Sequence, residues 1–251
     1  MGDFPSSLTA EIGHRPWPLP ERPWIMTQSW HDLLFAHWPV PVHALQDLLP
    51  HGLEPDLFDR QAWLGVVPFD MTNVAPRGVP ALPWVSAFAE LNVRTYVSVG
   101  GKPGVFFFSL DAGNPLAVAA ARTLFKLPYY AAEMQVRRVD GSVAYDSRRT
   151  TTRTPPAYFT ARYRPVAPPA PARQGTLEHF LTERYCLYLV DDMLRMHRLE
   201  IHHRPWLLQP AEASIDQNTM AEASGIRLTS AAPLLHYAAR QDVLVWPLAA
   251  I

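Results

Sequence analysis

Four polar side chains of different chemistry alternate along one short stretch of this sequence, residues 88–97. Glu90, Asn92, Arg94 and Tyr96 are each separated by one residue. This spacing predicts a β-strand that carries all four on one face. A buried carboxyl group can serve as a general acid or base, and a guanidinium can hold a carboxylate through paired hydrogen bonds. The stretch is therefore the best candidate for a binding or catalytic face.

Two structural interpretations of the same face compete with the functional one. The face could be solvated, or Glu90 could form an ion pair with Arg94 or Arg122 inside the domain. Phe88 and Tyr96 flank the polar residues, and aromatic rings are more typical of a cavity wall with a few fixed polar groups. The strand pattern alone leaves these alternatives open.

The elements that follow this strand supply further candidate residues. Residues 100–104 (GGKPG) predict a hairpin, and the apolar run 105–110 predicts a buried strand. Asn114 is a suitable helix cap, and Pro115 suits the first helical position. The predicted helix reaches Lys126, and Pro128 ends it. Candidate side chains on these elements and at the start of the next strand are Phe107, Arg122, Tyr129 and Tyr130.

The remaining pattern predicts a β-rich α+β fold, mostly antiparallel, with a few short helices. Residues 1–24 are rich in proline and are expected to form an extended arm, with Trp17 and Trp24 as anchors. Residues 25–251 are expected to form a single domain. Strands are predicted near 25–35, 62–71, 132–139, 142–150, 157–165, 184–188, 195–203 and 233–248. The hairpin with Asp140-Gly141 as its turn carries Arg137, Arg138, Arg148 and Arg149, which we expect to be solvated.

Composition narrows the classes of function. The net charge of −1 over 251 residues argues against a partner that is recognised by charge, such as nucleic acid or a membrane surface. The single cysteine, Cys186, and the scattered histidines predict neither a disulfide nor a metal site. No transmembrane run or signal sequence is visible, so we expect a cytoplasmic protein. A small organic molecule is the expected partner, no cofactor is expected, and a homo-oligomer is possible.

Several segments of the chain resemble the YqjF-like family, also called domain of unknown function 2071. The resemblance extends from about Trp24 to the end of the chain, and the family has no established activity that could be carried over. Its fold is similar to that of acetoacetate decarboxylase, a cone-like β-barrel that encloses a pocket. The segments that carry the resemblance are 88–97 (FAELNVRTYV), 104–112 (GVFFFSLDA), 127–129 (LPY), 182–188 (TERYCLY), 203–206 (HRPW) and 243–246 (VLVW).

The more distant resemblance to the decarboxylase can be followed residue by residue. Glu90 matches a strand glutamate, and Arg122 matches the arginine of a helical Gly-Arg-Glu motif, although Ala121 and Thr123 differ from its neighbours. The decarboxylase then has Pro-Lys-Lys, whose lysine forms a Schiff base with the keto acid. Here Tyr129 and Tyr130 stand in place of the two lysines. A phenol cannot form an imine, so we do not expect Schiff-base decarboxylation.

These observations lead to one functional hypothesis and two alternatives. The first is a protein that binds a small carbonyl or carboxylate compound in a barrel pocket. Asn92, Arg94, Tyr96, Phe107, Arg122 and Tyr130 would line this pocket together with Glu90 and Tyr129. One alternative is a lyase or hydrolase-type enzyme that uses Glu90 as acid or base and Tyr129 as a hydrogen-bond donor. The other is a non-catalytic sensor or a structural dimer.

Overall fold

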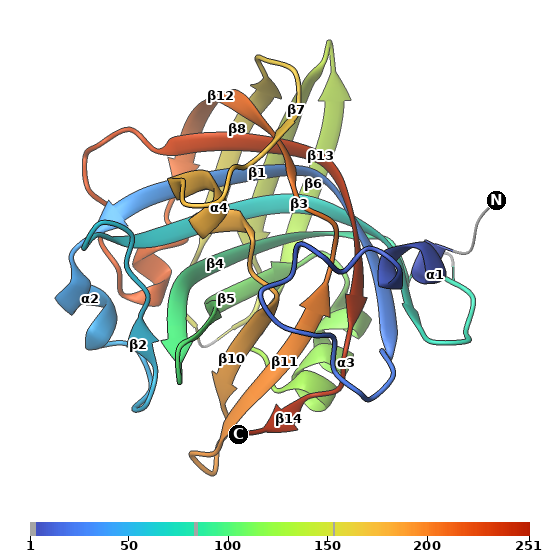
Figure 1. The fold of residues 1–251 in the computed structure, drawn as a ribbon. Helices are drawn as coiled ribbons and strands as arrows, with labels where there is room; N and C mark the ends of the chain where they lie inside the picture. Colours follow the sequence, from blue (N-terminus) through green and yellow to red (C-terminus); the bar gives the residue numbers. More distant parts are fainter. Residues whose placement is uncertain (1–3, 83–84, 153) are drawn as a thin grey trace.

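The computed structural model describes residues 4–82, 85–152 and 154–251 of the chain (Figure 1). Its helices are α1 (Phe4–Thr9), α2 (Val42–Gln46), α3 (Pro115–Phe125) and α4 (Leu177–Thr182), with a 3-10 turn at Glu222–Ser224. Its strands are β1 (Met26–Val40), β2 (Glu54–Pro55), β3 (Ala62–Pro76), β4 (Phe88–Val99), β5 (Lys102–Ala112), β6 (Tyr129–Val139), β7 (Ser142–Arg149), β8 (Tyr158–Pro165), β9 (Ala170–Pro171), β10 (Cys186–Val190), β11 (Met196–His202), β12 (Leu207–Asn218), β13 (Leu234–Val245) and β14 (Ala249–Ala250).

The strands form one branched sheet that closes on itself in two ways. Strand β5 pairs with β4 along one edge, and β13 pairs with β1 along one edge. Along the other edge, each of them pairs with two different neighbours. Residues 105–106 of β5 pair with β10, whereas residues 110–112 pair with β6. Residues 236–237 of β13 pair with β12, whereas residues 244–245 pair with β11. The sheet therefore divides at these two strands, while β1, β3 and β4 remain common to both branches.

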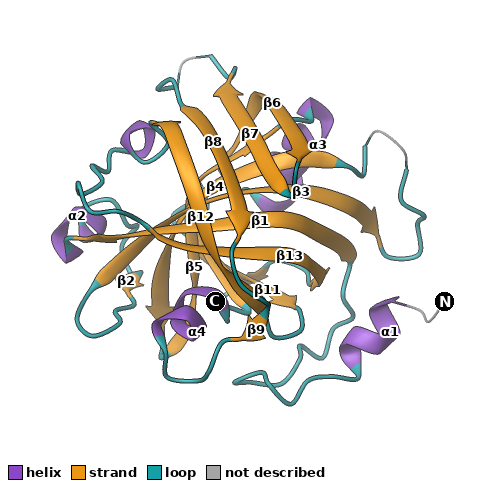
Figure 2. Ribbon diagram, turned by 90° about the horizontal axis from the view of Figure 1, so that it is seen from above, coloured by secondary structure: helices purple, strands orange, loops and turns teal. Residues whose placement is uncertain are grey.

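We name the two closed branches by the strand that distinguishes them. The β8 ring runs through β4, β5, β6, β7, β8, β12, β13, β1 and β3. The β10 ring runs through β4, β5, β10, β11, β13, β1 and β3. In Figure 1, β7, β8 and β12 lie at the top of the molecule, and β10 and β11 lie at the bottom with α3. In Figure 2, which shows the molecule from above, β7, β8 and β12 cross over the shared strands.

Side chains fill the β8 ring. Large aromatic residues from β7 and β8 meet aliphatic residues from the shared strands, and Tyr145 and Phe159 pack edge to face with ring centroids 6.2 Å apart. Their burial supplies much of the driving force for folding. The buried residues of this core include Leu34, Ala36, Leu64, Val66, Leu91, Val93, Val143, Ala161 and Tyr163. Leu91 and Val93 therefore face this core from β4.

A glycine allows β10 to approach β5 closely. A Cβ atom at Gly104 would lie 2.7 Å from the ring of Tyr188 and 2.9 Å from the carbonyl oxygen of Cys186. A backbone crossing at this distance leaves no room for a side chain. The parallel pairing of β5 with β10, and hence the closure of the β10 ring, depends on this residue.

The local predictions for the central stretch are confirmed. Asn114 caps α3 by accepting hydrogen bonds from the backbone amides of Leu116 and Ala117, and Pro115 opens the helix. Lys126 ends the helix in the left-handed conformation (φ 53°). The β-rich, mostly antiparallel α+β fold is also confirmed, since the parallel pairs among the strand pairings are β5–β6 and β5–β10.

One of the four arginines predicted to be solvated is buried. Arg149 at the end of β7 donates from Nε and Nη2 to the two carboxylate oxygens of Asp111, both at 2.7 Å. The prediction was wrong for this residue because its partner lies on β5, far away in the sequence. Arg137, Arg138 and Arg148 are exposed as expected.

The N-terminal segment contains a helix where an extended arm was expected. After α1, residues 10–24 follow the outer side of β11 and the end of β13 (Figure 1). Trp17 Nε1 donates to Glu200 (2.8 Å), and the ring of Trp24 stacks with Arg77, whose Cζ lies 4.8 Å from the ring centroid. Residues 1–3 of the predicted arm lie outside the described residues. None of the described helices is long and apolar enough to cross a membrane.

Candidate functional site

A cavity of about 310 Å³ lies inside the β10 ring. Every strand of that ring contributes to its wall, and α3 and the segment 182–206 complete it. Most of the lining is apolar. The cavity therefore lies on the opposite side of β1, β3 and β4 from the filled core of the β8 ring. Its position agrees with the predicted polar face of β4, because Glu90 and Arg94 both line it.

Glu90 and Tyr129 form a hydrogen-bonded pair in the cavity wall. The Tyr129 hydroxyl donates to Oε2 of Glu90 at 2.8 Å. Burial raises the pKa of the Glu90 carboxyl to about 8, with a smaller contribution from nearby Asp111, while the hydrogen bond from Tyr129 acts in the opposite direction. Burial and the neighbouring carboxylate also hold the pKa of Tyr129 well above its usual range. Glu90 is therefore mostly protonated at neutral pH and can donate its own proton to a ligand oxygen.

Arg94 lies four residues after Glu90 on β4, on the same face of the strand. No carboxylate of the described residues lies within ion-pair distance of its guanidinium. Its Nη2 donates one long hydrogen bond to the carbonyl of Leu181 (3.4 Å), and its Nε has no hydrogen-bond partner among the described atoms. The guanidinium stands over the ring of Phe35, with Cζ 5.3 Å from the centroid. The residue is 9% exposed. A buried cation in this state favours an anionic ligand.

The segment 182–206 brings polar groups to the wall that strand alternation could not identify. The indole Nε1 of Trp206 is buried and has no partner among the described atoms. Arg184 also lines the cavity, but its charge is matched by Asp56 at 2.5 Å. Both ring nitrogens of His203 face carbonyl oxygens, at 2.7 and 3.2 Å. These residues fall in the segments TERYCLY and HRPW. The family resemblance of those segments was the sequence feature that could have indicated them as part of the site.

The other predicted site residues have different positions. Phe107 lines the cavity from β5. Asn92 and Tyr96 are buried in β4 but do not line the cavity, and the Tyr96 hydroxyl lies 2.6 Å from Nε2 of His37. Arg122 is exposed on α3, where its Nε donates to the backbone carbonyl of Tyr129 (2.6 Å). Tyr130 does not line the cavity but packs on the buried Arg149, whose Cζ lies 4.1 Å from its ring centroid.

Neither lysine of the chain lines the cavity. Lys102 forms an ion pair with Glu200 and stands over the ring of Trp17. Lys126 pairs with Asp191 at 3.2 Å, beyond the end of α3. An amine that could attack a carbonyl group in the cavity is therefore absent from the lining formed by the described residues.

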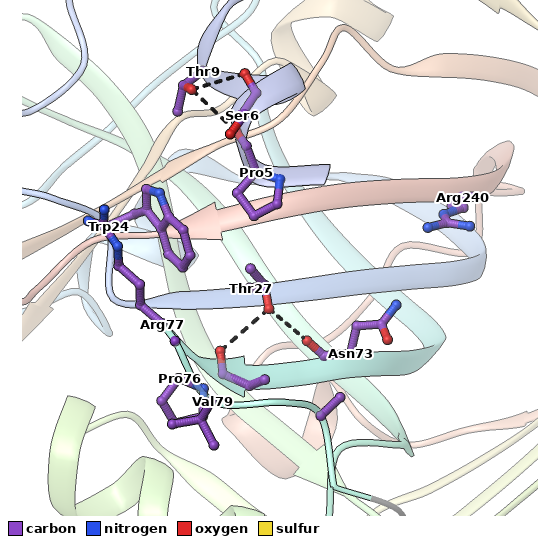
Figure 3. A pocket seen from close by; sticks show the side chains of 13 residues that line it. Pro5, Ser6, Thr9, Trp24, Thr27, Asn73, Pro76, Arg77, Val79 and Arg240 are labelled. Atoms are coloured by element: carbon purple, nitrogen blue, oxygen red, sulfur yellow. Dashed lines mark hydrogen bonds between the residues drawn. The ribbon is translucent and has the colours of Figure 1, made fainter. Parts of the chain in front are cut away.

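A second hollow lies on the surface between α1 and the ends of β1 and β3 (Figure 3). Among the described residues it shares only Pro76 with the cavity lining, and it contains none of the predicted site residues. Figure 3 shows Thr27 donating to the backbone carbonyls of Asn73 (3.0 Å) and Ala75 (3.4 Å). Trp24 and Arg77 stack on each other at its edge. This open groove lacks a buried polar group aimed into it, as far as the described residues show.

The described residues contain no group of three or more His, Cys, Asp or Glu side chains that could hold a metal ion. Cys186 lines the cavity, but burial raises the pKa of its thiol to about 11. The thiol is therefore protonated and unreactive at neutral pH. The polar groups that line the cavity include a protonated carboxyl group, a phenol and two guanidinium groups.

Solved structures confirm the fold. The enduracididine biosynthesis enzyme MppR, in complex with the condensation product of pyruvate and imidazole 4-carboxaldehyde, superposes with a TM-score of 0.63 at 10% identity, covering 91% of this chain and 90% of that one. Acetoacetate decarboxylase from Legionella pneumophila superposes with a TM-score of 0.62 at 11% identity, covering 95% and 93%. These chains share the acetoacetate-decarboxylase-like fold.

Sequence comparison gives the family. The chain is 49% identical over 241 residues to the uncharacterized protein YqjF of Bacillus subtilis, a match that covers 96% of this chain and 98% of that protein. Residues 27–242 match the family model DUF2071, described as an uncharacterized conserved protein. The chain therefore belongs to the DUF2071 family.

Proposed function

We propose that the protein binds a small organic acid that also carries a carbonyl group, inside the β10 ring. Arg94 holds the carboxylate, and protonated Glu90, supported by Tyr129, donates a hydrogen bond to the carbonyl oxygen. The observation that carries the proposal is the buried guanidinium of Arg94, which lines the cavity without a carboxylate partner among the described residues. A ligand carboxylate would supply the missing charge.

The protonation state of Glu90 also supports a ligand that carries a carboxylate. An ionised carboxylate beside the cavity would repel an anionic ligand, whereas the neutral form with a pKa of about 8 does not. MppR, which has the same fold, has been solved in complex with pyruvate and with the condensation product of pyruvate and imidazole 4-carboxaldehyde. Pyruvate, a carboxylate with an adjacent carbonyl, is therefore the first probe for this chain.

Calorimetric titration with pyruvate tests the proposal. We expect saturable binding at pH 7 that weakens at least about tenfold in Arg94→Gln, because a hydrogen bond to a charged group is lost. Arg164→Gln is the matched control, since Arg164 is exposed and its partner Glu212 lies outside the cavity. Equal affinity in the wild type and Arg94→Gln, or no binding of pyruvate, acetoacetate or acetate, would contradict the proposal.

The proposed binding does not include a Schiff base. The resemblance to the decarboxylase matches Tyr129 to a lysine of that enzyme, and Lys102 and Lys126 of this chain are paired outside the cavity. Borohydride reduction in the presence of pyruvate or acetoacetate should leave the intact mass unchanged, with a Schiff-base decarboxylase as positive control. A mass gain mapped to either lysine would contradict this part of the proposal.

The Glu90–Tyr129 pair also supports a second candidate function, an enzyme that uses Glu90 as general acid. A proton donated to a carbonyl oxygen makes the carbonyl carbon more electrophilic, which assists addition of water or cleavage of an adjacent carbon–carbon bond. Turnover of acetoacetate or pyruvate, followed by proton nuclear magnetic resonance, should then disappear in Glu90→Gln while binding and folding are kept. Unchanged substrate in the wild type favours binding alone.

A further inference from the structure

One face of α3 turns apolar side chains toward the cavity. Six residues of this helix line it, Leu116, Ala117, Ala120, Ala121, Leu124 and Phe125. Counted from Leu116, the others lie one, four, five, eight and nine positions further on, which places them on one face of a helix. A face of this kind is normally covered by other side chains, but the only residue of α3 that is buried is Val118. The cavity-facing stripe of α3 is therefore largely uncovered by protein.

The largest of these side chains are well exposed although they line the cavity. Leu116 is 68% exposed and Leu124 is 65% exposed. Val85, which precedes β4, also lines the cavity and is 41% exposed. Apolar surface in contact with water is unfavourable in proportion to its area. These three residues form an apolar mouth to the cavity.

The polar groups of Glu90 and Arg94 lie further inside the cavity than this mouth, and they follow one another along β4. The strand begins at Phe88, which lines the cavity close in sequence to Val85, and continues through Glu90 to Arg94. Residues four apart on a strand have Cα atoms about 13 Å apart. Arg94 is also enclosed by Phe35 and by Leu181, which is fully buried. A path from the mouth thus passes the Glu90–Tyr129 pair before it reaches the buried cation.

We propose that the ligand is an amphipathic carboxylate with an unbranched apolar chain. Its head group lies at Arg94, and its chain passes Glu90 and Tyr129 and lies against the stripe of Leu116, Ala120 and Leu124. This inference rests on the proposed function, since it assigns the head group to the same arginine. It adds that the chain, covered by α3, provides much of the affinity, and that pyruvate is only a minimal ligand.

Calorimetric titration with straight-chain carboxylates tests the inference. The series is acetate, butanoate, hexanoate, octanoate and decanoate, each below its micelle concentration. We expect affinity to rise about threefold to fourfold for each added methylene group until the stripe is covered. In the double variant Leu116→Asn, Leu124→Asn the increase should flatten beyond butanoate.

Leu194→Asn is the matched control, because Leu194 is 86% exposed in the β10–β11 turn and does not line the cavity. Its dependence on chain length should equal that of the wild type. A circular dichroism spectrum and a thermal unfolding transition equal to those of the wild type show that the double variant is folded. The same chain-length dependence in the double variant and the wild type would overturn the inference. So would a change of oligomeric state in the double variant without a change in that dependence, since a second copy would then be what covers α3.

Neutral 1-alkanols of the same lengths separate this inference from the proposed function. Short carboxylates that bind in an Arg94-dependent way, with no gain from longer chains, contradict the amphipathic ligand alone. Alkanols that bind as tightly as the carboxylates, with affinity that depends on Leu116 and Leu124, contradict the role of Arg94 and with it the carboxylate head group. Absence of binding by every member of both series contradicts both proposals.

Discussion

The two rings of the sheet share β1, β3 and β4 but enclose different interiors. The β8 ring is filled by interlocking aromatic and aliphatic side chains, whereas the β10 ring encloses a cavity of about 310 Å³. The difference begins within single strands, because Leu91 and Val93 face the filled interior and Glu90 and Arg94 face the cavity. One branch of the sheet can thus provide stability while the other remains open to a ligand.

Two buried arginines show the same contrast between the β8 ring and the β10 ring. Arg149 of the β8 ring has both carboxylate oxygens of Asp111 at 2.7 Å. Arg94 of the β10 ring is equally buried but has no carboxylate partner among the described residues. A protein tolerates an unpaired buried charge at the expense of stability, and such groups are typical of binding sites. The paired arginine is structural, and the unpaired one is the residue that we propose to bind the ligand.

The largest expected effect on the free energy of unfolding comes from replacing one phenylalanine inside the β8 ring, compared with one inside the β10 ring. Phe159→Ala should lower the free energy of unfolding by about 4 kcal/mol, because it opens a void in the filled core. Phe107→Ala should cost only about 1–2 kcal/mol, since its half-buried ring already borders the cavity. Urea denaturation of both variants measures the difference. Equal losses would mean that the two interiors are packed to the same degree.

The next effect concerns the two arginines. Arg149→Met should lower the free energy of unfolding by about 3 kcal/mol, because Asp111 is left buried without a partner. Arg94→Met in the ligand-free protein should change it by no more than about 1 kcal/mol in either direction. Thermal and urea unfolding of both variants provide the comparison. A large loss in Arg94→Met would show that this arginine is structural too.

The pH dependence of stability should be traceable to Glu90. Its pKa of about 8 in the folded protein lies above the ordinary value of 4.5, so between these values the folded state holds a proton that the unfolded chain releases. The free energy of unfolding should therefore fall as pH rises, by about 2 kcal/mol between pH 6 and pH 8. Glu90→Gln should remove this contribution. A variant with the same slope as the wild type would show that Glu90 is not the titrating group.

The smallest effect is expected on the outer surface of the β8 ring. Arg164 on β8 pairs with Glu212 on β12 at 2.5 Å, but both side chains are more than half exposed. Arg164→Gln should change the free energy of unfolding by less than about 0.5 kcal/mol, because solvent screens the pair. Urea unfolding at low and high salt checks this expectation. A loss comparable to that of Arg149→Met would show that burial is not what separates the two ion pairs.

The sequence was most informative where a local pattern determines the structure. Alternation predicted the two faces of β4, and hence that Glu90 and Arg94 lie on the same side. The cap at Asn114 and the Asp140-Gly141 turn followed from local conformational preferences. Alternation does not give depth along the strand, however. Asn92 and Tyr96 share the predicted face, and yet they lie buried beside other side chains instead of lining the cavity.

Features that depend on distant segments could not be predicted in this way. The branch at β5 requires parallel pairing with β6 and with β10, which lies about eighty residues further along the chain. The burial of Arg149 depends on Asp111, and the cavity wall depends on Trp206 and its neighbours. No periodicity within one segment records these contacts. The family resemblance of TERYCLY and HRPW indicated that these segments mattered, but not where they lie.

The shared strand β4 has a consequence for how such a protein can evolve. Leu91 and Val93 hold the strand in register against the filled core, since a shift by one residue would exchange the two faces. Substitutions on the other face, at the positions of Glu90 and Arg94, change the chemistry of the cavity wall and leave the residues of that core in place. One surface of the strand can thus diverge while the opposite one preserves the architecture. Chains only 10–11% identical can then share this fold and still differ in the chemistry of their side chains.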